Sequence, residues 1–269
     1  MKDIALVTLH GMGNIKKEYF KDLETNLRER LGSTWNRVAF HPVQYGDIMQ
    51  GPQNDLWDDM ISTGNNKLDQ ITLRKFLLFS FGDAGSLEHS AQVNDGKYRD
   101  IQRRIRDTLD LAWQSLGRDK TKPIIVIANS LGAQVISNYI WDAQNDNHLF
   151  SDADDSESAD HMHFRKLDTL DSLYTTGSNM PLFSAGIKDR LCFKKPHNDF
   201  RWINYYDPDD ILGWPLRQLG ASYSIIEDKR VNVGNWFTSW NPMSHTAYWT
   251  DNDFIRPLAN TIKEKLSKQ

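Results

Sequence analysis

The chain has 269 residues, a formal net charge of −4 and an isoelectric point near 6.1. This length predicts one large domain over residues 1–269 with a substantial core, rather than two independent domains. Basic residues neither dominate nor cluster in a stripe, which excludes a nucleic-acid partner. The single cysteine, Cys192, excludes an internal disulfide and a cysteine-based zinc cluster, and it fits a reducing compartment.

The first residues give no indication of export or of membrane insertion. Met1-Lys2-Asp3 runs directly into an apolar segment that is too short for a signal-peptide core. No stretch approaches the length that a membrane-spanning helix needs. We therefore expect a cytoplasmic protein without a transmembrane segment, and we leave peripheral contact with a membrane open.

Apolar runs of strand length alternate with helical patterns along the chain. The expected strands cover residues 4–9, 38–45, 124–128, 172–175, 202–206 and, in broken form, 223–233. The expected helices cover residues 19–31, 98–116, 132–143 and 254–268. This alternation predicts an α/β fold with a mostly parallel central sheet of about six strands and helices on both faces. In such sheets the active site lies at the carboxyl ends of the strands.

Two segments interrupt this alternation. Residues 46–97 contain a helix-like run at 73–79 amid Gly, Asn and Asp, so the segment is either a cap or lid over the site or a long excursion packed on the sheet. Residues 151–163 are strongly acidic and predict a solvated surface loop. His161 and His163 beside these acids are a weak metal-site candidate, because loops of this composition are usually only hydrated.

The most informative segment is the apolar run at 124–128 followed by Asn129-Ser130-Leu131-Gly132. Ser130 is flanked two residues away by Ala128 and Gly132, the small residues that a sharp strand-to-helix turn requires. The pattern predicts a serine hydroxyl held clear of the sheet above a helix N-terminus.

A serine hydroxyl becomes a strong nucleophile when a base takes its proton and an acid orients that base. With such a turn the expected chain order is Ser, then Asp or Glu, then His. Of the eight histidines, His245 alone lies beyond the last expected strands and close to the final helix. The acid should follow the strand at 202–206, where spacing does not separate three candidates, Asp207, Asp209 and Asp210.

An oxyanion that forms on the substrate needs backbone N–H donors already in place. One should come from Leu131, the residue after the serine. The other should come from the turn after the first strand, His10-Gly11-Met12-Gly13, in which Met12 is the best candidate. The alternative is that the two glycines only make a turn.

Together these features resemble the α/β-hydrolase superfamily. The resemblance spans nearly the whole chain and implies a Ser-His-Asp mechanism with no metal or organic cofactor. Because the first strand here already carries the His-Gly turn, the chain looks like a compact member that lacks the two leading strands.

A narrower resemblance is to intracellular lipases and phospholipases of the DDHD-domain type. Their acid stands in a segment similar to residues 210–214, and their histidine in one similar to residues 245–249 followed by Asp251. This similarity ranks Asp210 first as the acid, Asp207 second and Asp209 third. Asp83 resembles the aspartate that precedes a tyrosine-containing helix in that group, where Tyr98 stands here. The expected substrate-binding residues are His10, Gly11, Asp83 and Trp214.

The resulting hypothesis is a serine hydrolase that cleaves carboxylic esters, with lipid esters as one substrate class. A thioesterase, an amidase or an acyltransferase with the same residues stays open, because only the leaving group and the acceptor differ. A catalytically silent binding protein of the same fold is the other alternative.

Overall fold

The computed structural model describes residues 1–11, 16–62, 71, 74–75, 78–79, 82, 96–151, 158–233 and 244–269. Within these ranges, the side chains of residues 49, 50, 52, 62 and 244–246 lie outside the description. Met12 and Asp83, two of the expected site residues, also lie outside it, as do residues 152–157 of the acidic segment.

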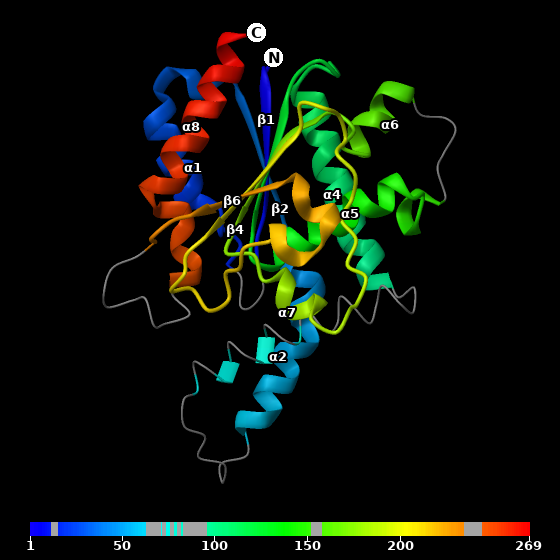
Figure 1. The fold of residues 1–269 in the computed structure, drawn as a ribbon, viewed down its shortest axis with the longest axis vertical. Helices are drawn as coiled ribbons and strands as arrows, with labels where there is room; N and C mark the ends of the chain where they lie inside the picture. Colours follow the sequence, from blue (N-terminus) through cyan, green and yellow to red (C-terminus); the bar gives the residue numbers. More distant parts are fainter. Residues whose placement is uncertain are drawn as a thin grey trace.

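Six strands form one parallel sheet in the order β2-β1-β3-β4-β5-β6 (Figure 1). The strands are β1 (Ile4–Leu9), β2 (Val38–Val43), β3 (Ile124–Asn129), β4 (Leu170–Thr176), β5 (Arg201–Tyr206) and β6 (Ile226–Arg230). The α/β architecture with a central sheet of six strands, predicted from the alternating pattern, is confirmed.

The sheet separates two apolar cores, and its central strands contribute to both. In β1, Ala5 and Val7 pack into one core, whereas Ile4 and Leu6 pack into the other. Side chains of successive strand residues point to opposite faces, so a strand covered on both faces has to be apolar throughout. This explains why five of the six residues of β1 are apolar and all six are buried.

Helices cover both faces of the sheet (Figure 1). On one face α1 (Lys21–Leu31) packs beside α8 (Asn252–Ser267), and on the other lie α4 (Gly96–Ser115) and α5 (Leu131–Gln144). The buried residues of α4 recur every three or four positions, as in Ile101, Ile105 and Leu109, which is the spacing of a helix with one apolar face.

Other helices depart from the sequence expectations. Residues Gly46–Ser62 form α2, although Gly51, Pro52 and several aspartates there favour a loop. Figure 1 shows α2 leading away from the edge of the sheet at which the strands end. The acidic segment is not a loop throughout, because Ala159–Arg165 forms α6 with Ser158 as its N-cap. The cap interpretation of residues 46–97 stays a prediction, since most of residues 63–95 lie outside the description.

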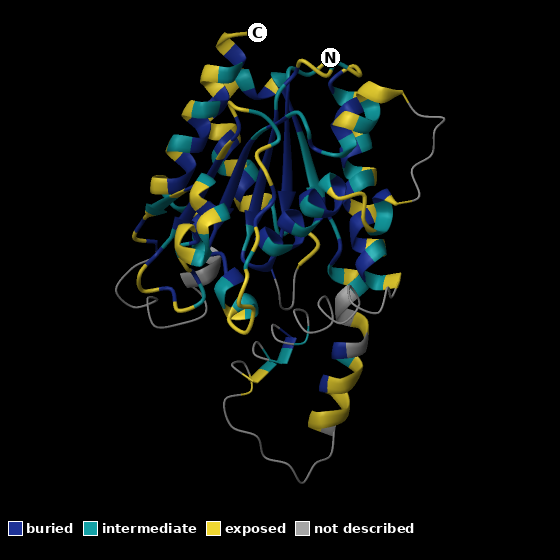
Figure 2. Cartoon of the chain, turned by 45° about the vertical axis from the view of Figure 1, so that its right-hand side comes forward, coloured by how far each residue is buried: buried dark blue, intermediate teal, exposed yellow. Residues whose placement is uncertain are grey.

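The short elements complete the fold. They are α7 (Met180–Ser184) and the 3-10 helices η1 (Gly32–Arg37), η2 (His148–Phe150), η3 (Arg217–Leu219), η4 (Ala221–Ile225) and η5 (Ser244–Thr250). Both chain ends lie at the amino ends of the strands, as Figures 1 and 2 show. The edge formed by the carboxyl ends lies at the opposite end of the sheet, where α2 departs.

Candidate functional site

The strand order places a switch point between β1 and β3. From β1 the chain crosses to β2 on one side, whereas β3, β4, β5 and β6 follow one another on the other side. In parallel sheets, ligands bind in the crevice beyond the carboxyl ends of the strands at such a point. Leu9 of β1 lies opposite Ala128 of β3, so His10 and Gly11 leave the sheet next to Ser130.

The serine turn (residues 128–132) has the strained backbone that the sequence predicts. Ser130 lies between β3 and α5 with φ 54° and ψ −124°, a left-handed conformation that non-glycine residues rarely adopt. Such strain costs about 1 to 3 kcal/mol and is concentrated at functional sites. The Ser130 N–H donates to the Thr176 carbonyl oxygen at 2.9 Å, which ties the turn to β4.

Small residues are required around this turn because other backbone segments approach it closely. A Cβ atom added to Gly132 would lie 2.5 Å from the carbonyl oxygen of His10. A Cβ atom added to Gly11 would lie 2.6 Å from the Cβ atom of Ser130. The two strand ends therefore meet with no room for a side chain between them, and Ser130 itself is only 1% exposed.

The two predicted oxyanion donors are Leu131 and Met12. Leu131 is the first residue of α5, and N–H groups in the first turn of a helix lack carbonyl partners within that helix. Its N–H therefore has no carbonyl partner within α5, and its role as an oxyanion donor stays a prediction. The predicted donor Met12 lies outside the described residues.

The three acid candidates on the loop of residues 207–216 differ in their surroundings. Asp209 is exposed, whereas Asp207 and Asp210 are buried, at 2% and 4% exposure. The two carboxylate oxygens of Asp207 accept from the N–H groups of Asp209 at 2.9 Å and Val233 at 2.6 Å. These bonds give Asp207 a structural task, because it joins β5 to the segment after β6.

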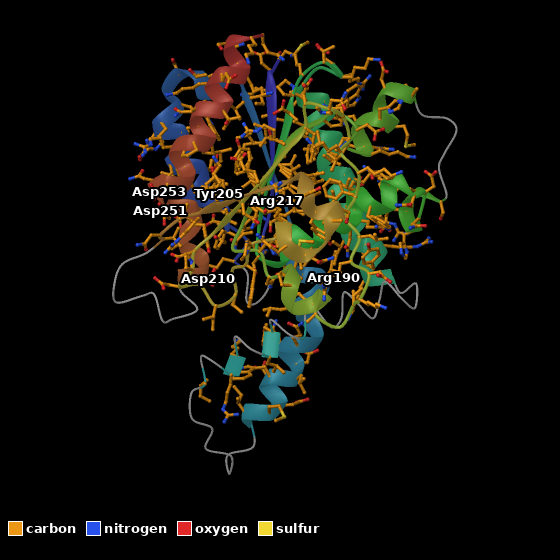
Figure 3. All side chains as sticks on the ribbon, in the orientation of Figure 1. Arg190, Tyr205, Asp210, Arg217, Asp251 and Asp253 are labelled. Atoms are coloured by element: carbon orange, nitrogen blue, oxygen red, sulfur yellow. The ribbon has the colours of Figure 1, made fainter. Side chains whose placement is uncertain are left out.

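Asp210 lies at the carboxyl edge of the sheet, on the loop beyond β5 (Figure 3). Its Oδ1 accepts from the Leu212 N–H at 3.0 Å, and its Oδ2 accepts from the Tyr248 hydroxyl at 2.9 Å. His245 belongs to the same 3-10 helix as Tyr248, η5, but its side chain lies outside the described residues. The roles of Asp210 and His245 in a triad stay predictions.

A chain of polar side chains across β4, β5 and β6 anchors the far end of loop 207–216. Thr175 donates to Asn204 Oδ1 at 2.8 Å, and Asn204 Nδ2 donates to Asp228 Oδ1 at 2.8 Å. Asn204 Nδ2 also reaches the carbonyl oxygen of Trp214, and the Asp228 carboxylate accepts from the N–H groups of Leu216 and Arg217. Polar side chains within the sheet thus fix the loop that carries Asp210.

A second chain of hydrogen bonds joins η5 to the serine turn. The indole N–H of Trp249 donates to Thr176 Oγ1 at 3.2 Å, and Thr176 Oγ1 donates to Asn129 Oδ1 at 2.8 Å. Asn129 immediately precedes Ser130. The helix that contains His245 is therefore tied to the turn that contains Ser130.

The buried ring of His10 supports the turn after β1. The ring is 3% exposed and stacks on Tyr45 with 3.8 Å between ring centroids. Its Nδ1 donates to the Gly11 carbonyl oxygen at 2.8 Å, and its Nε2 accepts from the Tyr45 N–H at 3.5 Å. Burial lowers the pKa of His10 to about 4, so the ring is neutral near pH 7. Through these contacts the ring supports the turn after β1, and its expected substrate contact stays a prediction.

Asn179 is a residue at the site that the sequence reasoning missed. It follows β4, is fully buried, and donates from Nδ2 to Ser130 Oγ at 3.4 Å. Asn179 stands at the N-cap of α7, yet its side chain makes no capping hydrogen bond. An N-cap asparagine usually bonds the helix's own N–H groups. The signal that could have indicated it is the segment Thr175-Thr176-Gly177-Ser178-Asn179, which lacks large apolar residues and covers the end of buried strand β4.

Trp214, expected at the substrate site, lies on loop 207–216 and is 41% exposed. Its N–H donates to the Ser178 carbonyl oxygen at 2.9 Å, so it lies close to the segment that holds Asn179. No substrate contact follows from this position alone. Asp83 lies outside the described residues, and its expected role stays a prediction.

Among the described residues, no group of three or more His, Cys, Asp or Glu side chains is placed to hold a metal ion. His161 instead bonds Asp110 at 2.9 Å, and His163 bonds Asp168 at 2.7 Å. No helix in the described ranges is long and apolar enough to cross a membrane.

Comparison with known proteins gives only a remote structural likeness. No protein-family model matches the chain, and no curated protein matches it. An acetylxylan esterase structure superposes with a TM-score of 0.42 at 9% sequence identity, covering 99% of this chain and 100% of that chain. An iodinated complex of acetyl xylan esterase gives a TM-score of 0.42 at 10% identity, covering 99% of each chain. A likeness at this level carries no inference about activity.

Proposed function

We propose that the chain is a serine hydrolase that cleaves carboxylic esters through an acyl-enzyme intermediate. The observation that carries the proposal is Ser130, in a strained turn at the switch point of a parallel sheet. A strained serine between a buried strand and a helix N-terminus is typical of a nucleophile, and structural serines have no need of that conformation.

In the proposed mechanism Ser130 attacks the ester carbonyl carbon while His245 takes the hydroxyl proton. Asp210 holds the imidazole and stabilises the imidazolium that forms. The N–H groups of Leu131 and Met12 bind the oxyanion. His245 then gives the proton to the leaving alcohol, and water releases the acid from the acyl-enzyme by the same steps.

Two observations support Asp210 over Asp207 as the acid. Both oxygens of Asp207 accept backbone N–H groups that join β5 to the segment after β6, so the position has a structural reason to be aspartate. Asp210, by contrast, is joined through Tyr248 to the helix that contains His245. This agrees with the similarity of residues 210–214 and 245–249 to DDHD-domain lipases.

We further propose a substrate with an apolar acyl group, such as a lipid ester. The resemblance to DDHD-domain lipases and phospholipases supports this class. Ile211 and Trp214, on the loop beside the candidate acid, are 81% and 41% exposed. Exposed large apolar side chains at the edge of a site are suited to contact an apolar substrate.

The test is labelling with a fluorophosphonate probe combined with ester hydrolysis. Wild-type protein should be labelled, and Ser130→Ala should lose the label and several orders of magnitude in turnover. Ser137→Ala is the matched control, because Ser137 is a buried serine on α5 and should keep both signals. Labelling of Ser130→Ala at the wild-type level, or a folded wild type that is not labelled, would contradict the proposal.

The same hydrolysis assay identifies which aspartate is the triad acid and which substrate class is cleaved fastest. Asp210→Asn should lower turnover by about three orders of magnitude or more, whereas Asp209→Asn should leave it close to wild type. Matched p-nitrophenyl esters of short and long acyl chains, acyl-CoA thioesters and amides then define the leaving group. Faster release from thioesters than from oxygen esters would favour the thioesterase alternative.

A further inference from the structure

One buried hydroxyl contacts both ends of the turn that contains the candidate acid. Tyr248 has no exposed surface, and its hydroxyl accepts from the Asp207 N–H at 2.9 Å. The same hydroxyl donates to Asp210 Oδ2 at 2.9 Å. Because Asp210 N–H also donates to the Asp207 carbonyl oxygen at 3.1 Å, the turn from 207 to 210 is closed around this one group.

Gly213 provides the space for this contact. A Cβ atom added there would lie 2.6 Å from Asp210 Oδ2 and 2.8 Å from the Tyr248 hydroxyl oxygen. Its φ lies outside the left-handed range, so glycine is needed at this position for room and not for backbone freedom. Asp210 and Gly213, on one loop, and Tyr248, from η5, thus meet at one hydrogen bond.

The electrostatics favour a neutral tyrosine that donates to a carboxylate. Burial, with the charges of Asp210 and Asp207 nearby, raises the pKa of Tyr248 well above its usual range, so the hydroxyl keeps its proton. Hydrogen bonds from a neutral donor to a charged acceptor are about twice as strong as those between neutral groups.

Tyr248 also stands in a fixed relation to position 245. Both belong to η5, and positions three apart in a 3-10 helix lie on the same side of that helix. A group that fixes Asp210 to position 248 therefore also sets the distance between Asp210 and the backbone at position 245.

We propose that the Tyr248 hydroxyl is a positioning group, which holds the Asp210 carboxylate in place relative to the helix that contains His245. This inference rests on the proposed function. Without the hydroxyl, Asp210 Oδ2 loses the hydrogen bond from Tyr248 and the Asp207 N–H loses its bond to the same group, so the carboxylate is held less firmly relative to η5. Small misplacements of catalytic groups are costly in rate, up to about 100-fold for about 1 Å.

The test compares Tyr248→Phe with Tyr174→Phe. Tyr174 is the matched control, because it is 2% exposed and its hydroxyl also makes one side-chain hydrogen bond, to Thr261 at 2.9 Å, away from the site. Tyr248→Phe should lower kcat by about 10- to 100-fold with KM within about twofold of wild type. Tyr174→Phe should change neither by more than about twofold. It should also lose less stability in urea than Tyr248→Phe, because it removes one hydrogen bond between neutral groups, whereas Tyr248→Phe removes two hydrogen bonds.

A double-mutant cycle supplies a readout that a merely structural role would not change. In the Asp210→Asn background, Tyr248→Phe should lower kcat by less than about twofold, because its effect acts through the carboxylate. Gly213→Ala, which keeps the hydroxyl but crowds the same bond, should lower kcat in the same direction and covers the case that Tyr248→Phe folds poorly.

The outcomes separate this inference from the proposed function. An inactive Asp210→Asn beside a Tyr248→Phe that equals Tyr174→Phe would overturn the inference and leave the proposed function standing. An additive loss of kcat in the double mutant would also overturn it. Near wild-type turnover in Asp210→Asn would instead remove Asp210 from the proposed triad.

Discussion

The serine turn and loop 207–216 lie at the same edge of the sheet, but they are held by different means. The serine turn is held by the absence of side chains, since Gly11 and Gly132 let two backbone segments meet, residues 9–11 and residues 129–132. Loop 207–216 is held by hydrogen bonds that the Asp207 and Asp228 carboxylates accept and by one that the Tyr248 hydroxyl donates. The first means is steric and tolerates almost no added volume, whereas the second is polar and fails when an acceptor or donor is lost.

Among the changes that test this comparison, adding one methyl group to the serine turn should lower the free energy of unfolding the most. In Gly132→Ala the new Cβ would lie 2.5 Å from a backbone oxygen that cannot turn aside, so the free energy of unfolding should fall by about 3 kcal/mol. Gly186→Ala is the control, because a Cβ at Gly186 meets nothing within 4 Å, and its change should stay within about 0.5 kcal/mol. Urea denaturation of both variants measures this. Equal stabilities would show that the turn is not sterically closed.

Removing one acceptor from the loop anchors should have the next largest effect. Asp228→Ala leaves the Leu216 and Arg217 N–H groups without their acceptor, which should cost about 2 to 3 kcal/mol and lower ester turnover. The neighbouring Glu227 makes surface ion pairs with Arg201 and Lys229, so Glu227→Ala should cost less than about 0.5 kcal/mol. The measurement is urea denaturation with turnover in parallel. If Glu227→Ala lost as much stability as Asp228→Ala, the hydrogen bonds that Asp228 accepts would not be what holds loop 207–216.

Lowering the pH should reduce the free energy of unfolding through protonation of His10, which supports the serine turn. This effect should be smaller than those of the two substitutions above. The pKa of His10 falls from 6.5 to about 4 on folding because of burial, so the unfolded state binds the proton more tightly. Stability from this group is therefore present above about pH 6.5 and is lost as the pH falls toward 4, by about 2 kcal/mol between pH 7 and about pH 4.5.

The measurement is the free energy of unfolding at both pH values in wild type and His10→Asn. His10→Asn should lose less stability on acidification than wild type, because it lacks the titrating ring. Burial also lowers the pKa of His41, but His41 is present in both proteins and cancels in the difference. Equal losses in the two proteins would show that His10 does not link stability to pH.

The difference between the two regions also explains what the sequence could predict. A steric requirement is visible in the sequence as small residues at fixed spacing, so Ala128, Ser130 and Gly132 indicate the turn directly. A network of hydrogen-bonded side chains has no such fixed spacing in the sequence. Its members, such as Thr175, Asn204 and Asp228, come from three strands that meet only in the folded sheet.

The same reasoning applies to the acid and to Asn179. Three aspartates within four residues are equivalent by spacing, and only burial and partners separate exposed Asp209 from the other two. Asn179 could be predicted neither from periodicity nor from its N-cap position, because its side chain serves Ser130 instead of the helix. Helix α2 was missed since Gly51 and Pro52 favour a break that the folded chain does not make.

The position of the chain ends has a practical consequence. Both ends lie at the amino ends of the strands, and the candidate site lies at the other end of the sheet (Figures 1 and 2). A tether or a fused protein attached through a short linker at Met1 or Gln269 would therefore leave the site facing outward. Immobilisation by either end should preserve turnover on large ester-bearing particles, and attachment at exposed Ile211 should block it.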